Sequence, residues 1–319
     1  KVRSRVRFAV TGTPVENRLG ELWSIFSFLM PGYLPPYKSF CSRFEKPIVQ
    51  EEDQTAVRRL NQLTGPFILR RMKADVLKEL PPKTENVYRI ELEEEQRKLY
   101  LAAVVDAREK LRAAKPEDKM AVFAVLMRLR EICCDPRLIA DNWEGGSAKL
   151  DACVELITGA VEGGHRILLF SQFTSMLELL AKRLDAEGIS HFTLQGSTPK
   201  PVRAELVRRF NGGEVSVFLI SLRAGGTGLN LTAADIVIHY DPWWNVAAQN
   251  QATDRAYRIG QQNPVQVYKL IAQDTIEEKI VELQQAKQSL ADTVTGTADG
   301  AILSMRPDEL LQLLEGSEG

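Results

Sequence analysis

The chain has 319 residues, of which 44% are hydrophobic and 26% are charged. This composition is typical of a folded globular protein and excludes a chain that is disordered along its whole length. The net charge of −1 at pH 7 argues against a protein that coats nucleic acid through its bulk charge, but it leaves room for a local basic groove.

Neither a membrane span nor a metal site is expected from the sequence. The longest apolar run, 121–127, is far too short to cross a bilayer. None of the four cysteines forms a Cys-x-x-Cys pair, and the three histidines stand apart from one another. Adjacent Cys133 and Cys134 are typical of buried free thiols in a reducing compartment, so we expect a cytoplasmic protein.

The amino-terminal part is predicted to hold one strand, Val6–Val10, followed by helices with proline-rich joints between them. Two long helices are expected over Glu93–Ala114 and Glu117–Cys134. One strand cannot close a sheet, so either the helices form a bundle or the strand belongs to a sheet whose other strands lie outside the chain. We favour the second interpretation. The chain begins with Lys1, so we expect it to be part of a longer protein, and the unpaired strand predicts self-association.

From about residue 148 onward, short apolar strands alternate with helices. This alternation predicts an α/β fold in which a doubly wound parallel sheet is covered by helices on both faces. The expected strands are 167–170, 192–194, 215–220, 236–240 and 265–270, and the expected helices are 149–161, 174–187, 201–210, 246–257 and 275–290. A tail rich in glycine and threonine follows Asp292 and becomes weakly helical from Pro307.

A glycine-rich loop, Ser221–Leu231, follows the predicted strand 215–220 directly. Its three glycines, Gly225, Gly226 and Gly228, would allow a phosphate to approach the backbone at the carboxyl end of a parallel strand, where α/β sheets bind ligands. The alternative is a tight turn that needs glycine and binds nothing.

Two arginines stand on the helix predicted over 246–257 or just beyond it. Gln251, Arg255 and Arg258 are spaced by four and three residues, so we expect them to share one helix face. Guanidinium groups suit phosphate oxygens better than lysine does. The alternative is a solvated face on which Asp254 and Arg258 form an ion pair.

Two further motifs follow predicted strands. Asp241-Pro242-Trp243-Trp244-Asn245 could stack on a nucleic acid or anchor the core, and we expect one tryptophan in the core. Thr11-Gly12-Thr13-Pro14-Val15-Glu16-Asn17 could serve a ligand or cap the next helix.

Taken together, these motifs resemble those of the SWI/SNF-type ATPases of helicase superfamily two. The resemblance runs from Phe8 to Leu290, and the residues at 11–17 look like those of prokaryotic members. The matching pieces are T-G-T-P-V-E-N at 11–17, L-G-E-L-W-S at 19–24, F-I-L-R-R-M-K at 67–73, L-P-P-K at 80–83, L-L-F-S-Q-F at 168–173, L-Q-G-S-T at 194–198, the glycine loop at 221–231, D-P-W-W-N at 241–245 and Q-A-T-D-R-A-Y-R-I-G-Q at 251–261.

The resemblance implies a domain plan. Residues 1–32 would end a first RecA-like lobe, 33–145 would form a mostly helical connecting region, 146–291 would form the second RecA-like lobe, and 292–319 would be a tail. Family members hold ATP, Mg²⁺ and duplex DNA between their two lobes. The expected partners are therefore double-stranded DNA, the chain's own first lobe, and a DNA-bound protein or RNA polymerase. A prokaryotic protein of this kind would be associated with the nucleoid.

The resemblance also implies roles for individual residues. Arg255 and Arg258 would be arginine fingers that reach the γ-phosphate, with Gln251 beside them. A separate role, coupling the nucleotide state to DNA binding, would fall to Thr11, Gly12 and Thr13. The residues expected near the nucleotide are Gly226, Gly228, Asn230 and Asp254. The residues expected along the DNA are Ser171, Gln172, Gly196, Ser197, Thr198, Arg223, Gly225, Thr227 and Trp244.

Two departures from the family pattern affect the prediction. Val246 stands where the family usually has proline. No Gly-Lys-Ser/Thr occurs, and the only Asp-Glu pair before an apolar residue is Asp308-Glu309 in the tail. The ATP-phosphate loop and the magnesium motif are expected before Lys1, so this chain alone should not hydrolyse ATP. The alternatives are a non-hydrolysing module that binds nucleic acid or a partner, and an RNA-acting helicase of the same superfamily.

Overall fold

The computed structural model describes residues 4–11, 19–51, 53–69, 71, 77, 79–115, 118–140, 142–225, 228–291 and 305–315, without the side chains of residues 50 and 285–291. The chain divides into two compact units. The first contains Lys1–Lys78 with Gln284–Ala301, and the second contains Glu79–Leu283 with Ile302–Gly319.

The first unit is helical. Its helices are α1 (Leu19–Leu29), α2 (Tyr37–Phe40), α3 (Lys46–Gln50) and α4 (Gln54–Thr64), with a π-helical turn over Cys41–Glu45. Asp53 begins α4 by accepting a hydrogen bond from the backbone of Thr55. The helices bury a small core in which Phe26 and Phe40 are fully enclosed.

The strand predicted over Val6–Val10 is wrong. Residues 5–10 are not in regular structure, and Val10 is 99% exposed. A strand needs a neighbour that takes up its backbone hydrogen bonds, and none of the described residues pairs with this segment.

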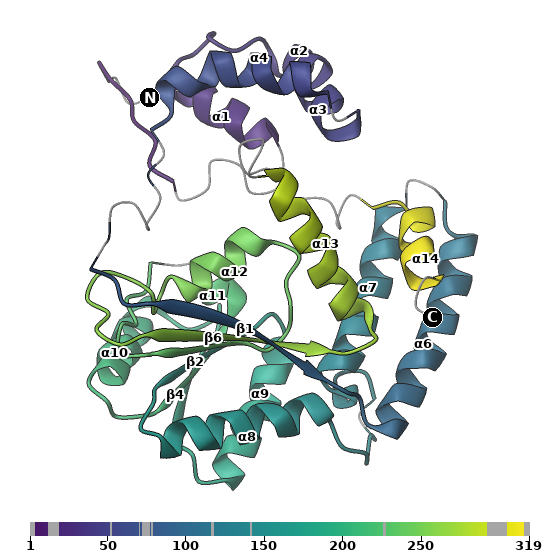
Figure 1. Cartoon of the computed structure of the whole chain (residues 1–319), viewed down its shortest axis with the longest axis vertical. Helices are drawn as coiled ribbons and strands as arrows, with labels where there is room; N and C mark the ends of the chain where they lie inside the picture. Colours follow the sequence, from purple (N-terminus) through teal and green to yellow (C-terminus); the bar gives the residue numbers. More distant parts are fainter. Residues whose placement is uncertain are drawn as a thin grey trace. The chain divides into compact units, whose positions relative to one another are not determined.

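The second unit contains a six-stranded sheet in which every strand pair is parallel (Figure 1). The strand order is β1-β6-β5-β2-β4-β3, so the chain crosses over between neighbours, and the predicted doubly wound fold is confirmed. The strands are β1 (Lys83–Ile90), β2 (Ile167–Ser171), β3 (His191–Leu194), β4 (Val217–Ser221), β5 (Ile236–His239) and β6 (Val265–Ala272).

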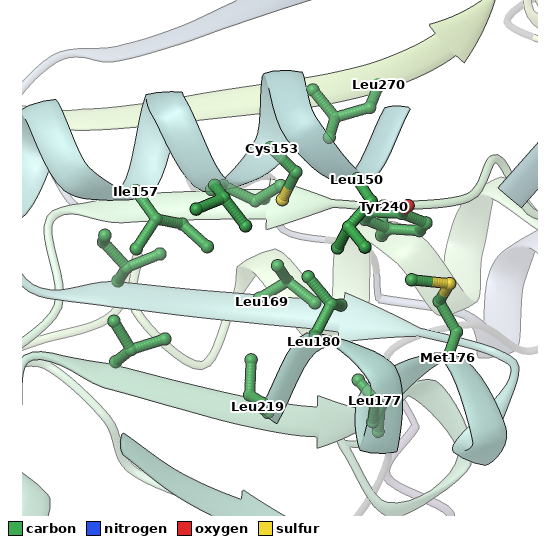
Figure 2. Packing of buried hydrophobic residues seen from close by; sticks show 14 of the residues in the cluster. Leu150, Cys153, Ile157, Leu169, Met176, Leu177, Leu180, Leu219, Tyr240 and Leu270 are labelled. Atoms are coloured by element: carbon green, nitrogen blue, oxygen red, sulfur yellow. The ribbon is translucent and has the colours of Figure 1, made fainter. Parts of the chain in front are cut away.

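Helices cover both faces of this sheet, and each face has its own apolar core. Figure 2 shows one of these cores, where Cys153 and Ile157 of a helix and Leu177 of another lie over Leu169 and Leu219 of the sheet. The helices of the unit are α6 (Glu94–Ala113), α7 (Lys119–Cys134), α8 (Ala148–Glu162), α9 (Thr174–Ala186), α10 (Lys200–Asn211), α11 (Leu222–Gly225), α12 (Val246–Thr253), α13 (Ile276–Ala291, which crosses into the first unit at Gln284) and α14 (Pro307–Glu315).

Strand β1 lies within a range that the sequence predicts to be helical. It forms one edge of the sheet and pairs with β6 in register from Lys83 opposite Val265 to Ile90 opposite Ala272. Only Ile90 of this strand is buried, so the segment lacks the apolar pattern that predicts a central strand. Helices α6 and α7 follow β1 and pack against each other and against α14.

A buried ion pair ties α8 to the start of α13. The Lys149 ammonium contacts the Glu277 carboxylate, and both side chains are fully buried. Glu277 also accepts a hydrogen bond of 2.9 Å from the backbone of Ala272, the last residue of β6. Burial raises the pKa of the Glu277 carboxyl, while the attraction of Glu277 outweighs burial at Lys149 and raises the pKa of that ammonium.

Candidate functional site

The predicted DNA-facing residues that the structure describes lie in or next to the loops at one edge of the sheet of the second unit. Because all the strands are parallel, their carboxyl ends meet at this edge, where ligands of α/β sheets bind. The loops after the adjacent strands β5, β2, β4 and β3 lie there in that order. Their described residues include Asp241–Asn245 after β5, Gln172 after β2, Arg223–Gly225 and Gly228–Asn230 after β4, and Gly196–Thr198 after β3.

The loop after β3 forms a tight turn. The Thr198 hydroxyl accepts a hydrogen bond of 3.0 Å from the backbone of Gln195, and the Thr198 backbone donates to the Gln195 carbonyl. Gly196 and Ser197 at the top of the turn are exposed, so their backbone groups are open to a ligand.

The glycine loop after β4 begins with the short helix α11, on which the Arg223 side chain is exposed. Gly225 is buried, and a Cβ atom at this position would lie only 2.8 Å from the Phe170 ring, so a larger residue would not fit without a shift. Gly228 and Asn230 are exposed. Gly226 and Thr227, which the sequence predicts to face nucleotide and DNA, lie outside the described residues.

The prediction that Gln251, Arg255 and Arg258 share one helix face is wrong. Helix α12 ends at Thr253, before either arginine. The Arg255 carbonyl accepts a 2.9 Å hydrogen bond from Leu231 of the glycine loop instead of continuing the helix. The next residues form turns, in which the backbone of Arg258 donates to Ala256.

The two arginines therefore occupy different environments. Arg255 is 8% exposed, and its Nε donates a hydrogen bond of 2.8 Å to the carbonyl of Gly225. Arg258 is exposed. Burial lowers the pKa of the Arg255 guanidinium, and the nearby positive charge of Arg258 lowers it further. This segment thus carries one arginine fixed to the glycine loop and one that is accessible to an anion.

Several other predicted site residues are less accessible than the prediction requires. Ser171 is 1% exposed, and its hydroxyl accepts a hydrogen bond from the backbone of Phe173. Trp244 is 4% exposed and packs edge-on against Phe123 of α7, so it is the tryptophan that belongs to the core. Neighbouring Trp243 is half-buried. A direct DNA contact by Ser171 or Trp244 does not fit this arrangement.

The remaining predicted residues are placed as follows. Gln251 is exposed and Asp254 is half-buried. Thr11 is exposed in the first unit, whereas Gly12 and Thr13 lie outside the described residues. Within the described part of the chain, no three histidine, cysteine or acidic side chains lie together in a way that could hold a metal ion. In the same part, no helix is long and apolar enough to cross a membrane.

One buried residue at this edge was not identified from the sequence. Arg130 of α7 is fully buried, and its guanidinium donates to the Asp241 carboxylate at 3.0 Å and to the Pro242 carbonyl at 2.6 Å. Arginine is almost never fully buried without partners, but a single arginine on a predicted helix carries no signal that would reveal them.

His239, at the end of β5, is buried. Its Nε2 lies 2.9 Å from the Thr253 hydroxyl at the end of α12. Burial, with help from the positive charges of Lys269 and Lys83 and against the opposite effect of Glu85, lowers the pKa of His239 from 6.5 to about 3. Between these two values the unfolded chain binds a proton that the folded chain excludes.

We therefore expect the contribution of His239 to the free energy of unfolding to be complete above about pH 6.5 and to fall by about 1.4 kcal/mol per pH unit toward pH 3. Urea unfolding of the wild-type protein and of His239→Gln at several pH values measures this contribution as a difference. Parallel pH profiles of the two proteins would contradict the assignment.

Comparison with known protein families gives two adjacent matches. Residues 1–138 match the SNF2-related domain, and residues 148–260 match the helicase conserved C-terminal domain. An uncharacterized ATP-dependent helicase of Mycoplasma genitalium is 39% identical over 99% of this chain. A mouse SWI/SNF-related matrix-associated actin-dependent regulator of chromatin, subfamily A member 1, is 37% identical over 98% of it. The chain spans about 30% of the length of each of these relatives.

Solved structures agree with these matches. The Sulfolobus solfataricus SWI2/SNF2 ATPase core in complex with double-stranded DNA is 34% identical, with a TM-score of 0.62 over 94% of this chain and 64% of that one. The C-terminal domain of the Sulfolobus solfataricus SWI2/SNF2 ATPase is 29% identical, with a TM-score of 0.60 over 72% of this chain and 96% of that one. The chain belongs to the SWI/SNF-type family of helicase-like ATPases, and its parallel sheet is the RecA-like fold of that family.

Proposed function

We propose that the chain supplies the second RecA-like lobe of an ATP-driven translocase on double-stranded DNA. In this proposal Arg258 acts as an arginine finger on the γ-phosphate, and Arg255 is the second finger and also the anchor of the segment. The observation that carries the proposal is the hydrogen bond from Arg255 to Gly225, which fixes the arginine segment to the glycine loop at the ligand-binding edge of the sheet.

The nucleotide-facing part of the proposal depends on charge and accessibility. An exposed guanidinium at Arg258 can donate two parallel hydrogen bonds to phosphate oxygens. Its neighbour Arg255 adds positive charge without competing for the same space, since its Nε is held by Gly225. Asn230, Asp254, Gln251 and Gly228 are proposed to line the same side.

The DNA-facing part of the proposal depends on exposed groups at the same edge. Gly196 and Ser197 offer backbone groups and a hydroxyl at the top of the turn that half-buried Thr198 holds, and Arg223 offers a positive charge. Contacts of this kind position a protein on the phosphate backbone without reading sequence. The DNA in the related Sulfolobus complex supports duplex DNA as the partner.

ATP and Mg²⁺ are proposed to be used by the complete protein. The phosphate-binding loop and the magnesium motif are expected on the first RecA-like lobe, so the γ-phosphate that Arg258 is proposed to reach would lie between the two lobes.

The test is ATP hydrolysis by the complete protein with and without duplex DNA. We expect duplex DNA to stimulate hydrolysis, and single-stranded RNA to have little effect. Hydrolysis that responds to RNA instead would favour an RNA-acting helicase. The absence of hydrolysis under all conditions, together with retained DNA binding, would favour a module that binds nucleic acid or a partner without using ATP.

A further inference from the structure

Arg130 lies where three segments of the second unit meet. It belongs to α7, and its guanidinium reaches the loops that follow two neighbouring strands, β2 and β5. One terminal nitrogen donates to the Gln172 Oε1 atom at 3.0 Å. The other donates to Asp241 and to the carbonyl of Pro242. Asp241 in turn accepts a hydrogen bond of 3.1 Å from the backbone of Gln172.

Aromatic rings surround the guanidinium. Its central carbon lies 4.9 Å from the ring centre of Trp244, 5.5 Å from that of Trp243 and 5.4 Å from that of Phe173. The two tryptophan rings stack at 4.3 Å. The flat guanidinium can pack against the aromatic rings and donate hydrogen bonds from its edges at the same time, which the compact ammonium of lysine cannot do.

The loop that Arg130 holds leads directly to the arginine segment. Asn245, four residues after Asp241, begins α12 by accepting a hydrogen bond of 2.6 Å from the backbone of Ala248. Helix α12 then runs to Thr253, just before Arg255. The other loop that Arg130 holds contains Gln172 and faces the proposed DNA path. The guanidinium thus joins the DNA-facing edge to the beginning of the segment that carries the fingers.

We infer that Arg130 is a positioning residue that couples DNA contact at the loop after β2 to the placement of Arg258. This inference rests on the proposed function. In the proposed function, Arg130 contacts neither DNA nor nucleotide. The hydrogen bonds of its guanidinium hold the loops after β2 and β5 in one relative position. If DNA displaces the loop after β2, the loop after β5 moves with it, and so does the start of α12. A side chain that retained only the charge would hold Asp241 but would release Gln172.

The experiment compares the complete wild-type protein with its Arg130→Lys variant and measures ATP hydrolysis at saturating duplex DNA and without DNA. We expect the stimulation ratio to fall by about tenfold in Arg130→Lys, because coupling residues typically change linkage by factors of this order. The KM for ATP is expected to stay within about twofold of the wild-type value, since a displaced arginine finger loses stabilisation of the transition state rather than ground-state binding of ATP.

A second variant guards against loss of folding through an unbalanced buried charge. Arg130→Gln combined with Asp241→Asn removes both charges, keeps hydrogen-bonding groups at both positions, and should lower the stimulation ratio as well. The matched control is Lys149→Gln combined with Glu277→Gln, which neutralises the other buried ion pair in the same unit. Its ratio should equal that of the wild type at a temperature where all the proteins are folded.

The outcomes separate the two claims. A DNA-stimulated wild type whose Arg130 variants keep the full ratio overturns the coupling and leaves the proposed function intact. A ratio that falls equally in the Lys149/Glu277 control also overturns the coupling, because loss of stability alone would then explain it. A wild-type protein that hydrolyses ATP without any response to DNA overturns the proposed function itself.

Discussion

Replacing Arg258 with alanine is expected to lower DNA-stimulated ATP hydrolysis by the complete protein by roughly 10³–10⁵-fold, the range typical of arginine fingers. The side chain is exposed, and it belongs to a turn rather than to a helix or strand. Its loss should therefore leave the fold and DNA binding unchanged. Steady-state hydrolysis rates and DNA-binding titrations on the same preparations measure both quantities.

Two further variants sharpen this test. Arg258→Lys keeps the charge but loses the fork of donors, so it should recover only a small part of the rate. Arg208→Ala is the matched control, because Arg208 is an exposed arginine of the same unit that pairs with Glu205 on the surface of α10. A rate for Arg258→Ala within tenfold of that of Arg208→Ala would exclude the finger role.

Arg255 should behave differently from Arg258. Its guanidinium is buried and donates to Gly225, and its carbonyl accepts from Leu231. Substitution by alanine removes the anchor between the glycine loop and the arginine segment along with the charge. We therefore expect Arg255→Ala to lose both activity and stability, so Arg258 is the cleaner probe of catalysis.

Lys149→Met is expected to lower the free energy of unfolding of the second unit by about 3–5 kcal/mol, because it leaves the Glu277 carboxylate buried without its partner. The double variant Lys149→Met/Glu277→Gln should recover most of the loss, since glutamine removes the charge and can still accept the hydrogen bond from Ala272.

Urea unfolding followed by tryptophan fluorescence measures both variants. Lys110→Met is a suitable control, because Lys110 pairs with Asp106 on the exposed face of α6 and such pairs contribute about 0.2–1 kcal/mol. If Lys149→Met costs no more than this control, the buried pair is not a major source of stability.

The sequence predicts most of the second unit because its central strands are short apolar runs separated by amphipathic helices. Strands β2 and β4 are buried along their whole length, and such runs are recognisable in any α/β protein. The edge strand β1 was missed for the opposite reason. Its residues are mostly charged or polar and all but Ile90 are exposed, so no apolar pattern marks it as a strand before it pairs with β6.

The sequence did not predict the geometry of the candidate site. The described part of the glycine loop follows β4, and Arg255 donates to Gly225 within it, but the spacing of Arg255 and Arg258 suggested a helix that in fact ends earlier, at Thr253. Arg255 accepts a hydrogen bond from Leu231 and donates one to Gly225, and these bonds set the backbone conformation there. Both partners are distant from Arg255 in the sequence. Arg130 could not be found for the same reason, since its partners at Gln172 and Asp241 lie far along the chain.

The pairing of β1 with β6 has a consequence for the order in which the protein is made. Strand β1 is translated long before β6, because their paired residues lie about 180 positions apart. At ordinary synthesis rates of about 5–20 residues per second, β1 waits on the order of 10–40 s for its neighbour. During that interval α6 and α7 can already pair with each other, because they are adjacent in the sequence. The sheet can therefore reach its full strand order only after β6 has been translated, because β6 is the strand that lies between β5 and β1.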